Sequence, residues 1–227
     1  MELEERIDDG VAWLTMNRPE ARNAMGAEMM AAMTEALPRL AADRSVRCVV
    51  LTGAGGAFCA GGDVKGFASQ AGGSEAAKPR GFDLEGRSQG LRAGMELSRI
   101  LHEMPKPTLA AIPGPAAGAG FSLAVACDLR IAIDTAKLTT AFAKVGLSGD
   151  YGGSFFLPYI VGQAKARELY FSASVISGQA AFELGLVNRV SGADSYEADV
   201  AQFARELADL PTVAVGYMKK NLNSAYG

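Results

Sequence analysis

The sequence predicts an α/β protein in which strands and helices alternate first and helices dominate the later part. Short apolar runs of strand length alternate with segments of helical apolar spacing as far as residue 133, and from Gly152 onward the spacing is mostly helical. Glycines and prolines separate these segments and mark turns. With 227 residues, of which 49% are apolar, the chain can bury a sizeable core.

The expected elements follow one another in a regular order. Strands are expected over residues 11–16 and 46–52, with a helix over 27–40 between them. Next come a helix over 91–104, a strand over 108–112, a glycine-rich turn over 114–120, a helix ending at Cys127 and a strand over 129–133. Further helices are expected over 164–172, 179–185, 197–210 and 212–223. Residues 69–90 contain five glycines and few apolar side chains, which predicts a mobile surface loop.

Composition and charge exclude several classes of function. The formal net charge of -3 and the pI near 5.3 provide no basic surface for nucleic acid, so a small-molecule substrate is expected. The acidic first ten residues do not resemble a signal peptide, which predicts a cytoplasmic protein. Residues 107–127 carry no charge, but their internal prolines and glycines would break a spanning helix, which favours a buried strand, turn and helix over a membrane span.

The cysteines and the single histidine indicate no metal site. Cys48, Cys59 and Cys127 form no C-x-x-C pair and, with only His102 beside them, supply no usual zinc site, so a reducing compartment fits best. His102 is expected at a surface or boundary position without a role. Ser122 lies in a run that imitates a nucleophile elbow, but an α/β-hydrolase needs its histidine later in the chain.

Two glycine-rich turns each follow a strand and precede an expected helix. They are residues 57–63, Ala-Phe-Cys-Ala-Gly-Gly-Asp, and residues 112–120, Ile-Pro-Gly-Pro-Ala-Ala-Gly-Ala-Gly. Backbone N–H groups at a helix N-terminus favour an anion, and two such donors can hold one developing oxyanion. The plainer alternative for the first turn is a tight connection capped by Asp63.

Two further segments belong with these turns: residues 17–24 (Asn-Arg-Pro-Glu-Ala-Arg-Asn-Ala) and residues 182–188 (Phe-Glu-Leu-Gly-Leu-Val-Asn). Together the four segments resemble the enoyl-CoA hydratase/isomerase (crotonase) family along nearly the whole chain. The resemblance implies a crotonase-like spiral of ββα units over residues 1–190. It also implies C-terminal helices over 191–227 that build a homotrimer or a hexamer, a dimer of trimers. Family members usually continue through further helices after the one expected from residue 212.

The same resemblance implies an acyl-CoA substrate, with coenzyme A present as part of the thioester and no separately bound cofactor. By motif position, the backbone N–H groups of Gly62 and Ala119 would hold the thioester oxygen, although most relatives have glycine at the second position. The residues implied to lie against coenzyme A are Arg22, Ala24, Ala60, Asp63, Val64 and Gly118.

The catalytic groups depart from those of the family's hydratases. Those enzymes use two glutamates, and at their positions the chain has Ser122 and Phe142, neither of which is a carboxylate base. Asp150 takes a position where several isomerases and a dehalogenase of the family place a catalytic aspartate, and the segment around it resembles ring-opening isomerases of phenylacetate catabolism. Read locally, Asp150 could instead cap the helix expected after Gly152.

Together these residues predict an enzyme that shifts a double bond in an acyl-CoA. Asp150 would move the proton while Gly62 and Ala119 stabilise the intervening dienolate. Two alternatives stay open: an enoyl-CoA hydratase that acts without the usual glutamate pair, and a non-catalytic acyl-CoA-binding or scaffold protein.

Overall fold

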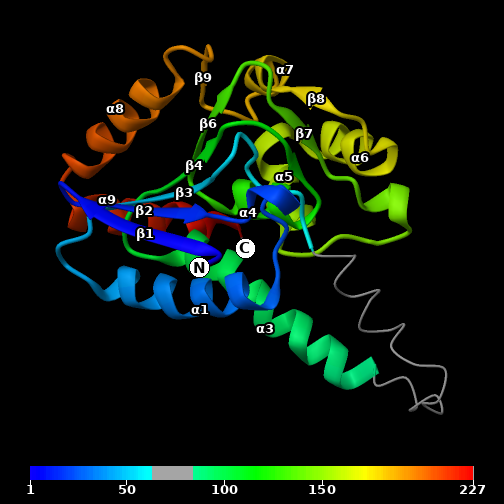
Figure 1. The fold of residues 1–227 in the computed structure, drawn as a ribbon, viewed down its shortest axis with the longest axis horizontal. Helices are drawn as coiled ribbons and strands as arrows, with labels where there is room; N and C mark the ends of the chain where they lie inside the picture. The colour runs from blue at the N-terminus through cyan, green and yellow to red at the C-terminus, as the bar shows by residue number, and fades with distance from the viewer. Residues whose placement is uncertain (63–83, 227) are drawn as a thin grey trace.

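The computed structural model describes residues 1–62 and 84–226, and within them the strands form two sheets (Figure 1). The larger sheet has the order β1-β2-β3-β4-β6-β9. Its strands are β1 (Leu3–Asp8), β2 (Val11–Met16), β3 (Cys48–Gly53), β4 (Thr108–Ile112), β6 (Leu129–Ile133) and β9 (Arg189–Ser191). The smaller sheet contains β5 (Ala116–Ala117), β7 (Lys137–Thr139) and β8 (Ile176–Ser177).

Most pairs in the larger sheet are parallel, which requires crossover connections between strands. Only β1 and β2 form an antiparallel pair there, and β2-β3, β3-β4, β4-β6 and β6-β9 are parallel. Helices lie in the intervening segments: α1 (Ala27–Ala42), α3 (Leu84–Glu103), α4 (Ala119–Ala126) and α7 (Gly178–Glu183). The predicted α/β class, with strand and helix alternating, is therefore confirmed.

Helices cover both faces of the larger sheet. On one face, α8 (Tyr196–Ala208) packs its buried side chains against residues of β2, β3, β4 and β6. On the other face, α1, α3 and α4 contribute to the main core. Figure 1 shows α8 and α1 on opposite sides of the strands. All five residues of β4 are buried, as expected of a central parallel strand covered on both faces.

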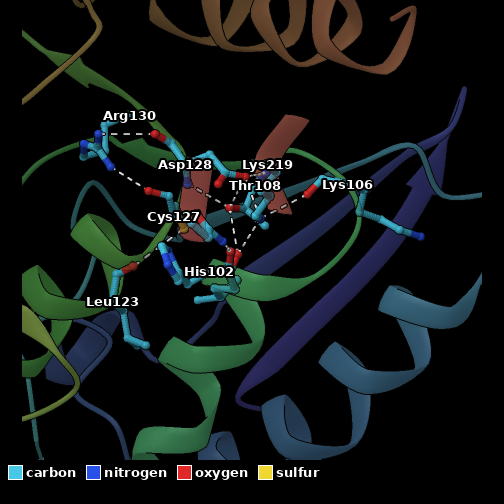
Figure 2. A network of polar contacts seen from close by, with 10 residues as sticks. His102, Lys106, Thr108, Leu123, Cys127, Asp128, Arg130 and Lys219 are labelled. Atoms are coloured by element: carbon cyan, nitrogen blue, oxygen red, sulfur yellow. Dashed lines mark hydrogen bonds and ion pairs between the residues drawn. The ribbon is translucent and has the colours of Figure 1, made fainter. Parts of the chain in front are cut away.

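The last long helix, α9 (Thr212–Asn223), is attached through a buried charge. Lys219 is only 7% exposed, and its Nζ donates to the carbonyl oxygens of Leu101 at 2.9 Å and Lys106 at 3.2 Å. The same Nζ lies 2.7 Å from Oδ2 of Asp128, which also accepts from the backbone N–H and hydroxyl of Thr108 (Figure 2). The ion pair is therefore completed by hydrogen bonds, as a buried pair requires.

The remaining helices agree with the expected order. After the short η2 (Phe142–Val145), the chain forms α5 (Gly153–Val161) and α6 (Gln163–Ser172), while η1 (Pro19–Ala21) and η3 (Ser224–Tyr226) are single turns. Helix α9 has the predicted bounds, and α6, α7 and α8 differ from the predicted ranges by one or two residues at an end.

Two expectations need correction. The loop predicted over residues 69–90 is wrong in its last part, because α3 already begins at Leu84; residues 69–83 lie outside the described residues. The strand predicted over 46–52 starts at Cys48 instead, because Val46 lies in the turn after α1, where its N–H donates to the carbonyl of Asp43.

Candidate active site

Three motifs that are far apart in the sequence lie side by side. The segment after η1 pairs with the first glycine-rich turn, since the N–H of Ala60 donates to the carbonyl of Arg22 at 2.9 Å and that of Met25 to Gly61 at 2.8 Å. The first turn pairs in the same way with the second, since the N–H of Ala117 donates to the carbonyl of Cys59 at 2.9 Å. The backbone thus forms one continuous junction from all three motifs.

Asn23, to which sequence reasoning gave no role, holds this junction together. Its fully buried side chain donates to the carbonyls of Ala54 at 2.9 Å and Ala57 at 2.8 Å and accepts from the N–H of Arg18 at 2.8 Å. Three hydrogen bonds from one amide fix the first motif against the loop after β3. In the sequence, Asn23 is an ordinary loop asparagine. Its side-chain partners Ala54 and Ala57 lie more than thirty residues away, so the local sequence could not indicate this role.

The two proposed oxyanion donors lie on adjacent turns. Gly61 has a φ of +99°, and a Cβ there would lie 3.0 Å from the carbonyl oxygen of Ala117 and 3.5 Å from the backbone nitrogen of Ala119. Ala119 is the first residue of α4, so its N–H has no acceptor within the helix. Gly62, next to Gly61, bridges to Met25. The structure therefore brings the Gly62 and Ala119 segments together.

The residues implied to bind coenzyme A are only partly placed. Arg22 and Ala60 are exposed, Ala24 is half-buried, and the hydrogen bond from Ala60 to Arg22 puts these residues on one rim of the junction. Gly118 is buried on the neighbouring turn, with a φ of +54°. Asp63 and Val64 lie outside the described residues.

Asp150 is held in a tight loop between η2 and α5. Its neighbours Gly149 and Tyr151 both have positive φ, of +107° and +50°. The capping interpretation is wrong, since the N-cap of α5 is Gly152 and no side chain caps the helix. Instead, Oδ1 of Asp150 is buried and makes no hydrogen bond in the described part of the chain. Burial raises the pKa of this carboxyl group, which is the property expected of a base held ready for a proton.

Polar and aromatic side chains surround the loop of Asp150. A Cβ on Gly153 would lie 2.4 Å from Oγ of Ser122 and 2.5 Å from Oη of Tyr170, so both hydroxyls reach the start of α5. Phe142 is buried and stacks on the ring of Tyr170, with the ring centroids 6.2 Å apart. Ser122 and Phe142 therefore do lie near Asp150, and Tyr170 is a neighbour that the sequence did not indicate.

The single histidine of the chain packs on aromatic side chains of α5. His102 is half-buried and packs against the rings of Phe155 and Phe156, which agrees with the boundary position expected. Within residues 1–62 and 84–226, no three His, Cys, Asp or Glu side chains are grouped so as to hold a metal ion. No helix among the described residues is long and apolar enough to cross a membrane.

Comparison with known proteins assigns the chain to a family. The family profile described as "Enoyl-CoA hydratase/isomerase" matches residues 6–227. The chain belongs to the enoyl-CoA hydratase/isomerase family. It is 37% identical over 224 residues to 1,2-epoxyphenylacetyl-CoA isomerase of Escherichia coli (strain K12), a match that covers 96% of this chain and 80% of that protein. Over 217 residues it is 36% identical to 4-chlorobenzoyl coenzyme A dehalogenase-2 of Arthrobacter sp, covering 94% and 75%.

Solved structures confirm the crotonase-like fold of this family. The crystal structure of an enoyl-CoA hydratase from Polaromonas sp. JS666 superposes with a TM-score of 0.87 at 34% identity, covering 98% of this chain and 83% of that one. A structure described as a putative enoyl-CoA hydratase from Streptomyces coelicolor A3(2) gives a TM-score of 0.88 at 33% identity, covering 99% and 79%. Relatives thus include an isomerase, a dehalogenase and hydratases, so the reaction has to be argued from the residues of the site.

Proposed function

We propose that the protein shifts a double bond in an acyl-CoA, with Asp150 as the base. The single observation that carries this proposal is the buried Oδ1 of Asp150, which makes no hydrogen bond in the described part of the chain and belongs to a carboxyl group whose pKa burial raises. A carboxylate that must take a proton from one carbon and return it to another needs an oxygen without a competing donor. Ser122 and Phe142 offer no second carboxylate, which favours proton transfer over activation of water.

In this proposal the thioester oxygen lies between the backbone N–H groups of Gly62 and Ala119. Negative charge develops on that oxygen when Asp150 removes a proton, and two fixed donors lower the energy of the resulting dienolate. The coenzyme A part of the substrate would lie along the rim formed by Arg22, Ala24 and Ala60. Gly118 supports the Ala119 donor as the N-cap of α4.

Substitution of Asp150 by asparagine tests the proposal. Asp150→Asn keeps the shape of the side chain and removes the base, so isomerisation should fall by at least about 10²-fold. Because ionisation of a carboxyl group with a raised pKa opposes folding as pH rises, the variant should be no less stable than the wild type at pH 7–8, which thermal unfolding would show.

Two further measurements decide between the proposed reaction and the alternatives. The wild-type rate should fall as the pH is lowered through the raised pKa of Asp150, since the protonated carboxyl cannot accept a proton. The wild type should also shift the double bond of a 3-enoyl-CoA faster than it hydrates crotonyl-CoA. Full isomerase activity in Asp150→Asn would refute the role of Asp150, and rapid hydration by the wild type would favour the hydratase alternative.

We infer further that the protein assembles as a trimer or a dimer of trimers. Helix α9 supports this assembly because it leaves four large apolar side chains, Val213, Tyr217, Met218 and Leu222, between 60% and 75% exposed in the single chain. Light scattering should give three or six times the 23.6 kDa of one chain, and Leu222→Glu should lower that mass. A wild-type monomer at micromolar concentration would contradict the proposal.

A further inference from the structure

Tyr151, the residue that follows Asp150, has a backbone conformation that a bulky side chain rarely adopts. Its φ is +50°, in the left-handed region that glycine occupies easily. The chain does have glycine at two nearby positions of positive φ, Gly149 and Gly152, with values of +107° and +75°. Strained conformations persist where the surrounding structure holds them, and they gather at functional sites. A tyrosine at position 151 therefore needs a reason that its side chain supplies.

The side chain of Tyr151 ends where α1 and α3 pack against each other. Its hydroxyl donates to the thioether sulfur of Met30 on α1 at 3.7 Å, which is a weak hydrogen bond. A Cβ on Gly94 of α3 would lie 2.9 Å from Oη of Tyr151, so the phenol occupies the space that a side chain at position 94 would take. Tyr151 is buried and belongs to the main core. Two helices that are distant in the sequence thus fix the end of its ring.

The backbone connects this contact to Asp150. The carbonyl of Asp150 accepts from the N–H of Gly153 at 3.2 Å, so Asp150 and Tyr151 lie in one closed turn at the start of α5. A planar peptide bond keeps the Cα atoms of successive residues about 3.8 Å apart, so a shift of Tyr151 moves Asp150 with it. Burial, followed by the charge of Asp150, raises the pKa of Tyr151 to about 12. The phenol is therefore neutral at physiological pH and places no second charge beside the proposed base.

We infer that Tyr151 is a positioning residue, which sets the place of the Asp150 carboxylate through its contacts with Gly94 and Met30. This role rests on the proposed action of Asp150 as the base, and Tyr151 itself transfers no proton. A base has to lie within hydrogen-bond reach of the proton that it removes, and a misplacement of ~1 Å can lower the rate by about 10²-fold. The position of α3 would thus contribute to the rate from outside the reacting groups.

Substitution of Gly94 tests this role without changing the loop of Asp150. In Gly94→Ala the added methyl group would lie 2.9 Å from Oη of Tyr151, closer than these atoms can pack, so the phenol has to shift. The kcat for the double-bond shift of a 3-enoyl-CoA should fall about tenfold, because Asp150 moves with it. KM should change by less than about twofold, because the proposed coenzyme A rim is unaltered. Alanine favours a helix over glycine, so α3 should stay folded, which circular dichroism would show.

A second substitution should restore the rate. Once Oη is removed, the nearest neighbours of the added methyl group are Cε of Met30 at 3.4 Å and Cζ of the ring at 3.7 Å, both ordinary contacts. The double variant Gly94→Ala/Tyr151→Phe should therefore recover most of the wild-type kcat. The matched control is Gly90→Ala, one turn earlier in α3, where an added Cβ meets no atom within 4 Å and kcat should stay at the wild-type value.

The pH profile gives a reading that a merely structural role of Gly94 would not change. Burial raises the pKa of Asp150, so a carboxyl group displaced from its buried place should titrate at a lower pH. The acidic limb of kcat/KM should move to lower pH in Gly94→Ala and return in the double variant. Tyr151→Gly, which adopts a φ of +50° without strain but has no ring, should lower kcat and move the limb in the same direction.

The outcomes separate the positioning role from the proposed reaction. Wild-type kcat in Gly94→Ala or in Tyr151→Gly would overturn the positioning role, and so would a loss in Gly94→Ala that Tyr151→Phe does not repair. In each of these cases a large loss in Asp150→Asn would leave the proposed function standing. Full activity in Asp150→Asn would refute the base itself, and the positioning role with it.

Discussion

At the scale of single residues, the proposed role of Ala119 depends on its backbone N–H group and not on its side chain. The family resemblance implies glycine at the position of Ala119. The residue is helical and is not among those with positive φ, so a methyl group causes no backbone strain. The proposed catalytic group is the N–H, which glycine and alanine both supply.

This argument predicts different effects for two substitutions at one position. Proline is tolerated at the first position of a helix, so Ala119→Pro should remove the N–H and leave α4 folded. The rate should then fall by about 10²- to 10³-fold, as is typical for the loss of one oxyanion donor. Ala119→Gly, the control, should keep most of the activity in the same assay. A folded Ala119→Pro enzyme with wild-type turnover would exclude Ala119 as a donor.

At the scale of elements, the sequence predicts those parts whose apolar residues form a run of strand length or recur at helical spacing. Helix α9 and strands β2, β4 and β6 have the predicted bounds. Strand β1 could not be found in this way because only Leu3 of its six residues is buried, and this edge strand contains no apolar run. The first turns of α3 were missed for a similar reason, since their side chains are exposed wherever they are described.

The site was predictable only as far as its motifs could be recognised. The positions of Gly62, Ala119 and Asp150 came from resemblance, and their roles remain predictions. What the sequence could not show is the set of contacts made across distant segments. Asn23 acts through carbonyls of the loop after β3, and Tyr170 reaches residues 149–153 because α6 folds back over them. Neither residue differs in its local sequence from an ordinary loop or core residue.

At the scale of the whole molecule, the C-terminal helix depends on one buried cation. Lys219 connects α9 to the end of α3 through the carbonyl of Leu101 and to the sheet through Asp128 (Figure 2). Apolar packing of α9 is limited, because Lys219 is the only buried residue of this helix among those described. The ion pair therefore has an unusually large share in fixing the position of α9.

Removal of this cation should detach α9 from the rest of the fold. Lys219→Met leaves the carboxylate of Asp128 without its counter-charge and two carbonyls without their donor, so the free energy of unfolding should fall by about 3 kcal/mol. The neighbouring exposed Lys220 provides the control, and Lys220→Met should change stability by less than about 0.5 kcal/mol. Urea unfolding at one fixed protein concentration would measure both, since assembly makes apparent stability depend on concentration. Equal stability of the two variants would mean that apolar contacts, rather than the Lys219–Asp128 pair, hold the helix in place.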